Sequence, residues 1–136
     1  MTSHAASCRC GQLRATVTGE PYRVSVCHCL NCKKRSGSAF AVQARWPRDQ
    51  ITLEGQSNIF VKVADSGNRA TFHFCPDCGS DVYYEIDGKF DAKFNNLLAI
   101  PLGAFDDPFF LSPQFSVWEV RKPDWLEIVG DDIERD

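Results

Sequence analysis

Long hydrophobic runs are missing from this 136-residue sequence. No stretch approaches the roughly 20 apolar residues that span a bilayer, and the opening residues MTSHAASCRC lack the apolar core of a signal peptide. A long basic stripe is missing as well, and the formal net charge is -3, which disfavours binding to a polyanion. These absences predict a cytoplasmic protein with no membrane partner and no nucleic-acid partner.

Internal repeats and low-complexity segments are also absent, and the length suits a single domain over residues 1–136. Helical periodicity is nearly absent too, since only residues 29–36, CLNCKKRS, favour a short helix. Short runs rich in β-branched and aromatic residues recur instead, and several alternate as half-buried strands do. The expected strands cover residues 12–17, 22–26, 39–46, 58–63, 70–74, 81–86, 95–100 and 115–120. The sequence predicts an all-β fold that ends in a solvated acidic tail, about residues 130–136.

Seven cysteines are present, and an odd number in a reducing compartment favours metal binding over structural disulfides. CRCG (8–11) and CPDCG (75–79) each place two cysteines at a turn that is followed directly by glycine, as in zinc knuckles. Together they predict a closed structural zinc site, whose ligands are Cys8, Cys10, Cys75 and Cys78. The alternative is that Cys8 and Cys10 are only small buried hydrophobic residues.

Cys27, Cys29 and Cys32 form a second set, one ligand short of a tetrahedral site. Catalytic zinc sites usually have three protein ligands and leave the fourth position to water or substrate. Three alternatives stay open: His28 or His73 closes a second structural site, the CxxC of residues 29–32 is a redox pair, or the cysteines hold an iron–sulfur cluster.

Three cations, Lys33, Lys34 and Arg35, directly follow the second cysteine set. A metal ion with three thiolates and an added substrate thiolate carries excess negative charge, and nearby cations offset it. The alternative is an ordinary solvated loop. We expect the run to attract an anionic thiol.

The motifs CRCG (8–11), CHCLNCKKRSGSAF (27–40), FCPDCGSDVYY (74–84), AIPLGAFDDP (99–108) and SVWEVRKPDW (116–125) resemble the glutathione-dependent formaldehyde-activating enzymes. The zinc-binding domain of that family also occurs in the centromere protein V group. The resemblance covers nearly the whole chain and implies an Mss4-like fold of several small antiparallel sheets with zinc knuckles. It also implies two zinc ions per chain, with the structural and catalytic ligand sets described above.

The activity implied by the resemblance is carbon–sulfur lyase chemistry, in which glutathione and formaldehyde form S-(hydroxymethyl)glutathione. The substrate sulfur would then be the fourth ligand of the catalytic zinc. Proximity in the sequence suggests a substrate-binding set for the thiol, namely Lys33, Lys34, Arg35, Arg45 and Trp46. Two positions depart from the family pattern, because Lys33 stands where arginine is common and Ser116 where histidine is common. The alternative function is a non-catalytic zinc module that binds a protein through an exposed β surface.

Overall fold

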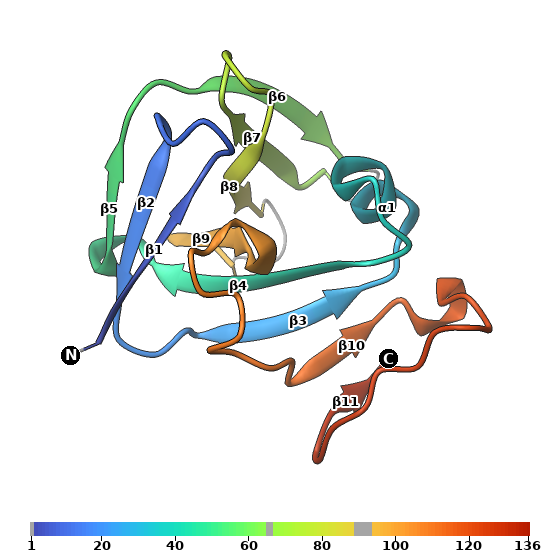
Figure 1. Cartoon of the computed structure of the whole chain (residues 1–136). Helices are drawn as coiled ribbons and strands as arrows, with labels where there is room; N and C mark the ends of the chain where they lie inside the picture. The colour runs from blue at the N-terminus through green and yellow to red at the C-terminus, as the bar shows by residue number, and fades with distance from the viewer. Residues whose placement is uncertain (1, 65–66, 89–93) are drawn as a thin grey trace.

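The computed structural model describes residues 2–64, 67–88 and 94–136 (Figure 1). Within these ranges the chain is mostly β-structure, with one short α-helix and three single 3-10 turns. The strands are β1 (Ser3–Ser7), β2 (Arg14–Thr18), β3 (Arg23–Cys27), β4 (Ala41–Pro47), β5 (Ile51–Glu54), β6 (Asn58–Val63), β7 (Arg69–Phe74), β8 (Asp81–Asp87), β9 (Leu97–Pro101), β10 (Phe115–Val117) and β11 (Glu134–Arg135). The helix is α1 (Leu30–Ser36). No described helix has the length and apolar character of a membrane span.

The strands form two sheets, which confirms the all-β prediction. One is three-stranded in the order β1-β2-β5, and the other is eight-stranded in the order β11-β10-β3-β4-β9-β8-β7-β6. Most pairs are antiparallel, but β10 runs parallel to both β3 and β11. The parallel pairing brings Val117 beside Cys27, so the C-terminal segment lies next to the second cysteine set.

The main core lies between the two sheets. Ala15 and Val17 of the small sheet belong to the same buried cluster as Trp46, Leu98 and Ile100 of the large sheet. β3 and β9 in the middle of the large sheet are buried on both faces, whereas β6 at its edge is exposed on both. Short hydrophobic runs such as LLAIP therefore form central strands, as expected for strands without a solvent face.

Each run that the sequence marked as a strand overlaps one, with ends that differ by up to three residues, and α1 lies within the predicted residues 29–36. The run 115–120 is strand only to Val117, because Trp118 adopts a left-handed conformation with φ 59° and starts a 3-10 turn. β1, β5 and β11 were not predicted. The C-terminal tail is more than a solvated extension, since Glu134–Arg135 pairs with β10 and Arg135 Nη1 bonds Glu119 at 3.1 Å.

Two hairpins carry the paired cysteines. β1 pairs with β2 from Ser7 opposite Arg14, which leaves residues 8–13 as a connecting loop. β7 pairs with β8 and reaches Phe74 opposite Asp81, which leaves residues 75–80 as a second loop. The cysteine pairs at 8 and 10 and at 75 and 78 therefore lie on loops between rigid strands.

Candidate metal centres

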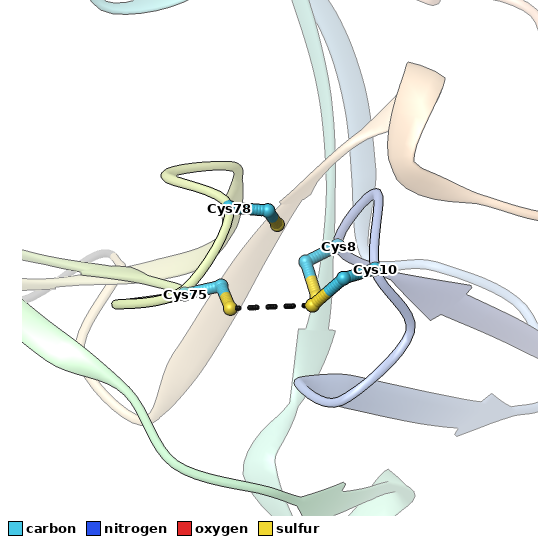
Figure 2. Close-up of side chains that lie close together, drawn as sticks. All are labelled: Cys8, Cys10, Cys75 and Cys78. Carbon is cyan, nitrogen blue, oxygen red and sulfur yellow. Dashed lines mark hydrogen bonds between the residues drawn. The ribbon is translucent and has the colours of Figure 1, made fainter.

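The two hairpin loops bring four cysteines together, as Figure 2 shows. The sulfur of Cys10 lies 3.6 Å from that of Cys8 and 3.7 Å from that of Cys75, and Cys78 completes the group. Zinc bound by four thiolates at about 2.3 Å in a tetrahedron requires neighbouring sulfurs about 3.8 Å apart. The spacing and the soft thiol donors thus fit a four-coordinate zinc ion.

Backbone and side-chain N–H groups point at these sulfurs. Leu13 N donates to Cys8 Sγ at 3.3 Å, and Gln12 Nε2 donates to Cys75 Sγ at 3.0 Å. The pKa of Cys78 falls to about 5, first because of a hydrogen bond from the Ser80 backbone. Donors of this kind favour the thiolate form that a metal ion requires.

Glycine completes both loops. Gly11 has φ 86° and its N–H bonds the carbonyl of Cys8, while Gly79 has φ 77° and bonds that of Cys75. Positive φ is readily accepted by glycine but not by most residues. The glycine after each cysteine pair therefore serves the tight turn that the sequence motif predicted.

The remaining three cysteines lie where β3 ends and α1 begins. Cys27 is the last residue of β3, paired with Ala41 of β4, and Cys32 is buried in the first turn of α1. Cys29 is the N-cap of α1, and its sulfur accepts a hydrogen bond from Cys32 N at 3.3 Å. All three sulfurs lie within 4.8 Å of one another. The end of β3 and the start of α1 thus bring three candidate metal ligands together within six residues.

Cys32 has a strongly acidic thiol. Its pKa is lowered to about 6, chiefly by a hydrogen bond from Cys27 and with help from Cys29 and Arg35, although burial acts in the opposite direction. Arg35 is itself fixed by an ion pair between its Nη1 and Asp81 Oδ2 at 2.7 Å. A thiolate at Cys32 is therefore available near neutral pH.

No fourth ligand completes this set among the described residues. His28 points its Nε2 at Ser116 Oγ at 3.0 Å, and Ser116 donates to Glu119 at 2.6 Å. Because the one hydroxyl proton of Ser116 goes to Glu119, His28 donates from Nε2. His73 on β7 bonds Ser57 and stacks on Tyr83. The helix after Cys29 joins antiparallel strands, so no βαβ unit surrounds the CxxC.

The three cations of the run 33–35 point in different directions. Lys33 Nζ bonds the carbonyl of Arg121 in the C-terminal segment at 2.5 Å. Lys34 and Arg35 line a cleft of about 1180 Å³ that lies between the two cysteine groups. Only the second and third cations of the run thus face this cleft.

Arg45 and Trp46 lie away from it. Arg45 is buried, and its Nη2 donates to the hydroxyl of Tyr84 at 3.1 Å. Trp46 has no exposed surface and donates its indole N–H to the carbonyl of Gly19. Trp46 belongs to the main core, whereas Cys27 and Cys32 belong to a separate small cluster. The structure therefore does not bring Trp46 to the three cysteines.

A comparison with known families agrees with this arrangement. The family model of the glutathione-dependent formaldehyde-activating enzyme matches residues 3–121, a span that includes all seven cysteines. The chain belongs to this family. Its resemblance to the formaldehyde-activating enzymes, noted above on five motifs, is thereby confirmed.

One relative and one solved structure show how far the likeness extends. A protein of Penicillium rubens, described as "Putative glutathione-dependent formaldehyde-activating enzyme", is 27% identical over 111 residues. The alignment covers 80% of this chain and 56% of the relative, so the chain spans little more than half of that protein. The crystal structure of a Rhodobacter sphaeroides protein has the same fold, with a TM-score of 0.53 at 16% identity over 75% of this chain and 87% of the other.

Some residues acquire a role only in the structure. Gln12 contacts Cys75 across the four-cysteine group, and its Oε1 accepts a hydrogen bond from Gln56 N. Glu119 joins Ser116 to Arg135 behind the three-cysteine group. Gln12 directly follows the CRCG motif, so the sequence itself could have indicated that this residue lies next to the four-cysteine group. Nothing in the sequence links Glu119 to residue 28.

Proposed function

We propose that this protein is a zinc-dependent carbon–sulfur lyase. It forms or breaks an S-hydroxymethyl adduct between a thiol such as glutathione and formaldehyde or a similar small aldehyde. The observation that carries the proposal is the unequal ligand count, four cysteines in one group and three in the other. A closed set suits a structural metal ion, and an open set suits a reactive one.

The proposal includes two zinc ions per chain. Cys8, Cys10, Cys75 and Cys78 would hold the structural one, and Cys27, Cys29 and Cys32 the catalytic one. Zinc in the second group would leave one coordination position for a substrate thiol and would lower the pKa of that thiol. The seven free cysteines fit a reducing compartment, which supports a cytoplasmic location.

The reaction itself needs no oxidant. The thiol sulfur forms a bond to the carbonyl carbon, the π electrons of the C=O bond move to oxygen, and that oxygen takes the proton that the thiol gave up. The reverse reaction breaks the carbon–sulfur bond. The protein must therefore favour the thiolate and hold it close to the aldehyde.

Lys34 and Arg35 are the cations placed to assist. Both line the cleft beside the three-cysteine group, and glutathione carries two carboxylates that they can attract. Because Arg35 is already paired with Asp81, the ammonium group of Lys34 is the more available partner for a glutathione carboxylate. Lys33, Arg45 and Trp46 have internal partners, and the proposal assigns them no substrate contact.

Cobalt substitution tests the proposal, because thiolate–cobalt charge-transfer absorption reports the number of sulfur ligands. Titration with glutathione should raise this absorption by one further thiolate per chain. S-methylglutathione has no free thiol and is the matched control, which should change nothing. An unchanged spectrum with both ligands would contradict the proposal and favour the non-catalytic zinc module.

A further inference from the structure

The cleft between the two cysteine groups is far larger than formaldehyde requires. Its volume is about 1180 Å³, and pockets of roughly 300–1,000 Å³ accommodate drug-sized molecules. Its walls come from α1, from β6 and β7, from the loop after Cys78 and from the 3-10 turn Leu102–Ala104. Formaldehyde, with a single carbon, leaves nearly all of this space unused.

One end of the cleft is lined by neighbours of the three-cysteine group, although none of the three cysteines lines it. Asn31 and Arg35 line it from α1, the helix that also carries Cys32. Ala41 lines it as well and pairs directly with Cys27. A ligand at this end of the cleft therefore contacts residues that adjoin the group that the proposed function makes reactive.

Four phenylalanines form an aromatic wall, defined here as Phe40, Phe60, Phe72 and Phe74. The Phe60 and Phe72 rings lie 6.4 Å apart, and Phe72 packs on Tyr84 at 4.9 Å. Phe60 remains 59% exposed on the edge strand β6. A large exposed apolar side chain beside a cleft is typical of a binding surface, and glutathione has no aromatic or branched apolar group to cover it.

The same cleft is strongly cationic although the chain has a net charge of -3. Its charged lining residues are Arg9, Lys34, Arg35 and Lys62 against the single carboxylate of Asp81, which pairs with Arg35. Within the described part of the chain, Arg9, Lys34 and Lys62 form no ion pair. Cations left without partners beside apolar walls attract an anion that also has an apolar part.

We propose that the cleft binds an aromatic aldehyde that bears a carboxylate. Its ring would lie against the aromatic wall, its carboxylate near Lys62, which lines the cleft from the same strand as Phe60, and its carbonyl toward the three-cysteine group. This inference rests on the proposed function, because the bound aldehyde accepts the thiol. The sulfur–carbon bond forms, the C=O π electrons move to oxygen, and the oxygen takes the thiol proton.

The probe for this inference is 4-formylbenzoate, with 4-methylbenzoate as an unreactive analogue and benzaldehyde as a neutral one. Binding is measured by calorimetry on the zinc-loaded protein without thiol. Phe60→Ser should weaken binding of both carboxylates about five- to tenfold, because it removes an aromatic contact. Ile59→Ser is the matched control, since Ile59 is 58% exposed on the same strand, alternates to the other face and does not line the cleft.

A separate variant tests whether a lysine of the cleft binds the carboxylate of the ligand. Replacing Lys62 by glutamine should weaken 4-formylbenzoate binding about two- to fivefold at low salt and leave benzaldehyde binding unchanged. The loss should shrink at high salt. Equal losses for the two aldehydes would overturn the assignment of the carboxylate.

Two further outcomes separate this inference from the proposed function. If formaldehyde and glutathione react but 4-formylbenzoate does not bind, or binds equally to the Phe60 and Ile59 variants, this inference is wrong and the proposed function stands. If 4-formylbenzoate binds through Phe60 but no thiol adduct of either aldehyde forms, the proposed function is wrong. The ligand class of the cleft would then be supported by the binding data alone.

Discussion

The two cysteine groups differ in how the chain supplies their ligands. The four-cysteine group draws on two hairpin loops, and Cys10 and Cys75 are 65 positions apart. The three-cysteine group lies within residues 27–32, on a strand end and a helix start that the sheet and α1 already fix. A metal ion in the first group joins distant parts of the fold, whereas one in the second joins parts that are already adjacent. In the proposed division of roles, ligand separation along the chain, as well as ligand number, would distinguish a structural metal ion from a reactive one.

The largest effect is expected for Cys78→Ser. Loss of a ligand from the four-cysteine group disconnects the two hairpins, and structural zinc binding is coupled to folding. We expect the free energy of unfolding to fall by about 3–5 kcal/mol or more, enough to leave much of the protein unfolded at 25 °C. Thermal unfolding followed by circular dichroism measures this, and a variant as stable as the natural protein would contradict the structural role.

Cys29→Ser should instead leave the protein folded while its second metal ion and its activity are lost. Serine is a good N-cap, so the variant keeps a hydrogen-bond acceptor for the N–H of Cys32 at the start of α1. Cys29→Ala is the matched control, and it should lose the same metal ion plus about 1 kcal/mol of stability. Metal content and thermal midpoints of the two variants check this. If either unfolds as completely as the Cys78 variant, the division between the groups is wrong.

Ser116→Ala should have a smaller effect. It removes the hydroxyl between His28 and Glu119 and leaves the buried Nε2–H of His28 without a partner, which costs about 1–3 kcal/mol. We also expect weaker retention of the metal ion at the three-cysteine group, because His28 lies between two of its ligands. Ser25→Ala is the control, since Ser25 is also buried and makes neither contact. Equal losses of stability and metal in the two variants would show that Ser116 only fills space.

The smallest effect is expected for Lys34→Gln. The affinity for glutathione should fall about two- to fivefold at low salt, and the loss should diminish as salt screens the charge. Lys33→Gln is the matched control, because Lys33 bonds the Arg121 carbonyl and does not line the cleft. Calorimetric titration measures the glutathione affinity of the two variants. The comparison fails if the Lys33 variant loses as much affinity as the Lys34 variant.

The sequence was informative wherever the signal was local. Hydrophobic alternation located most strands, and the glycines after Cys10 and Cys78 indicated turns with positive φ. The pairing of CRCG with CPDCG was also predictable, because each motif needs two more ligands. These features depend on neighbours within a few positions, so one sequence is enough to indicate them.

Features that depend on tertiary pairing were not predictable. The parallel contact of β10 with β3 places Ser116 behind His28, and no short-range pattern indicates such a contact. Trp46 and Arg45 lie close to the basic run in sequence, yet the sheet buries their side chains away from the cleft. The aromatic wall draws on β6 and β7 as well as on Phe40, and its members become neighbours only when the sheet forms.

The most direct test of the central claim is metal analysis before and after mild chelation, with folding followed in parallel. The account predicts two zinc ions per chain. A moderate chelator should remove one of them, from the three-cysteine group, while the circular dichroism spectrum stays unchanged. The second should leave only under conditions that unfold the protein. A single zinc ion per chain, or two that leave together with loss of the fold, would contradict the account.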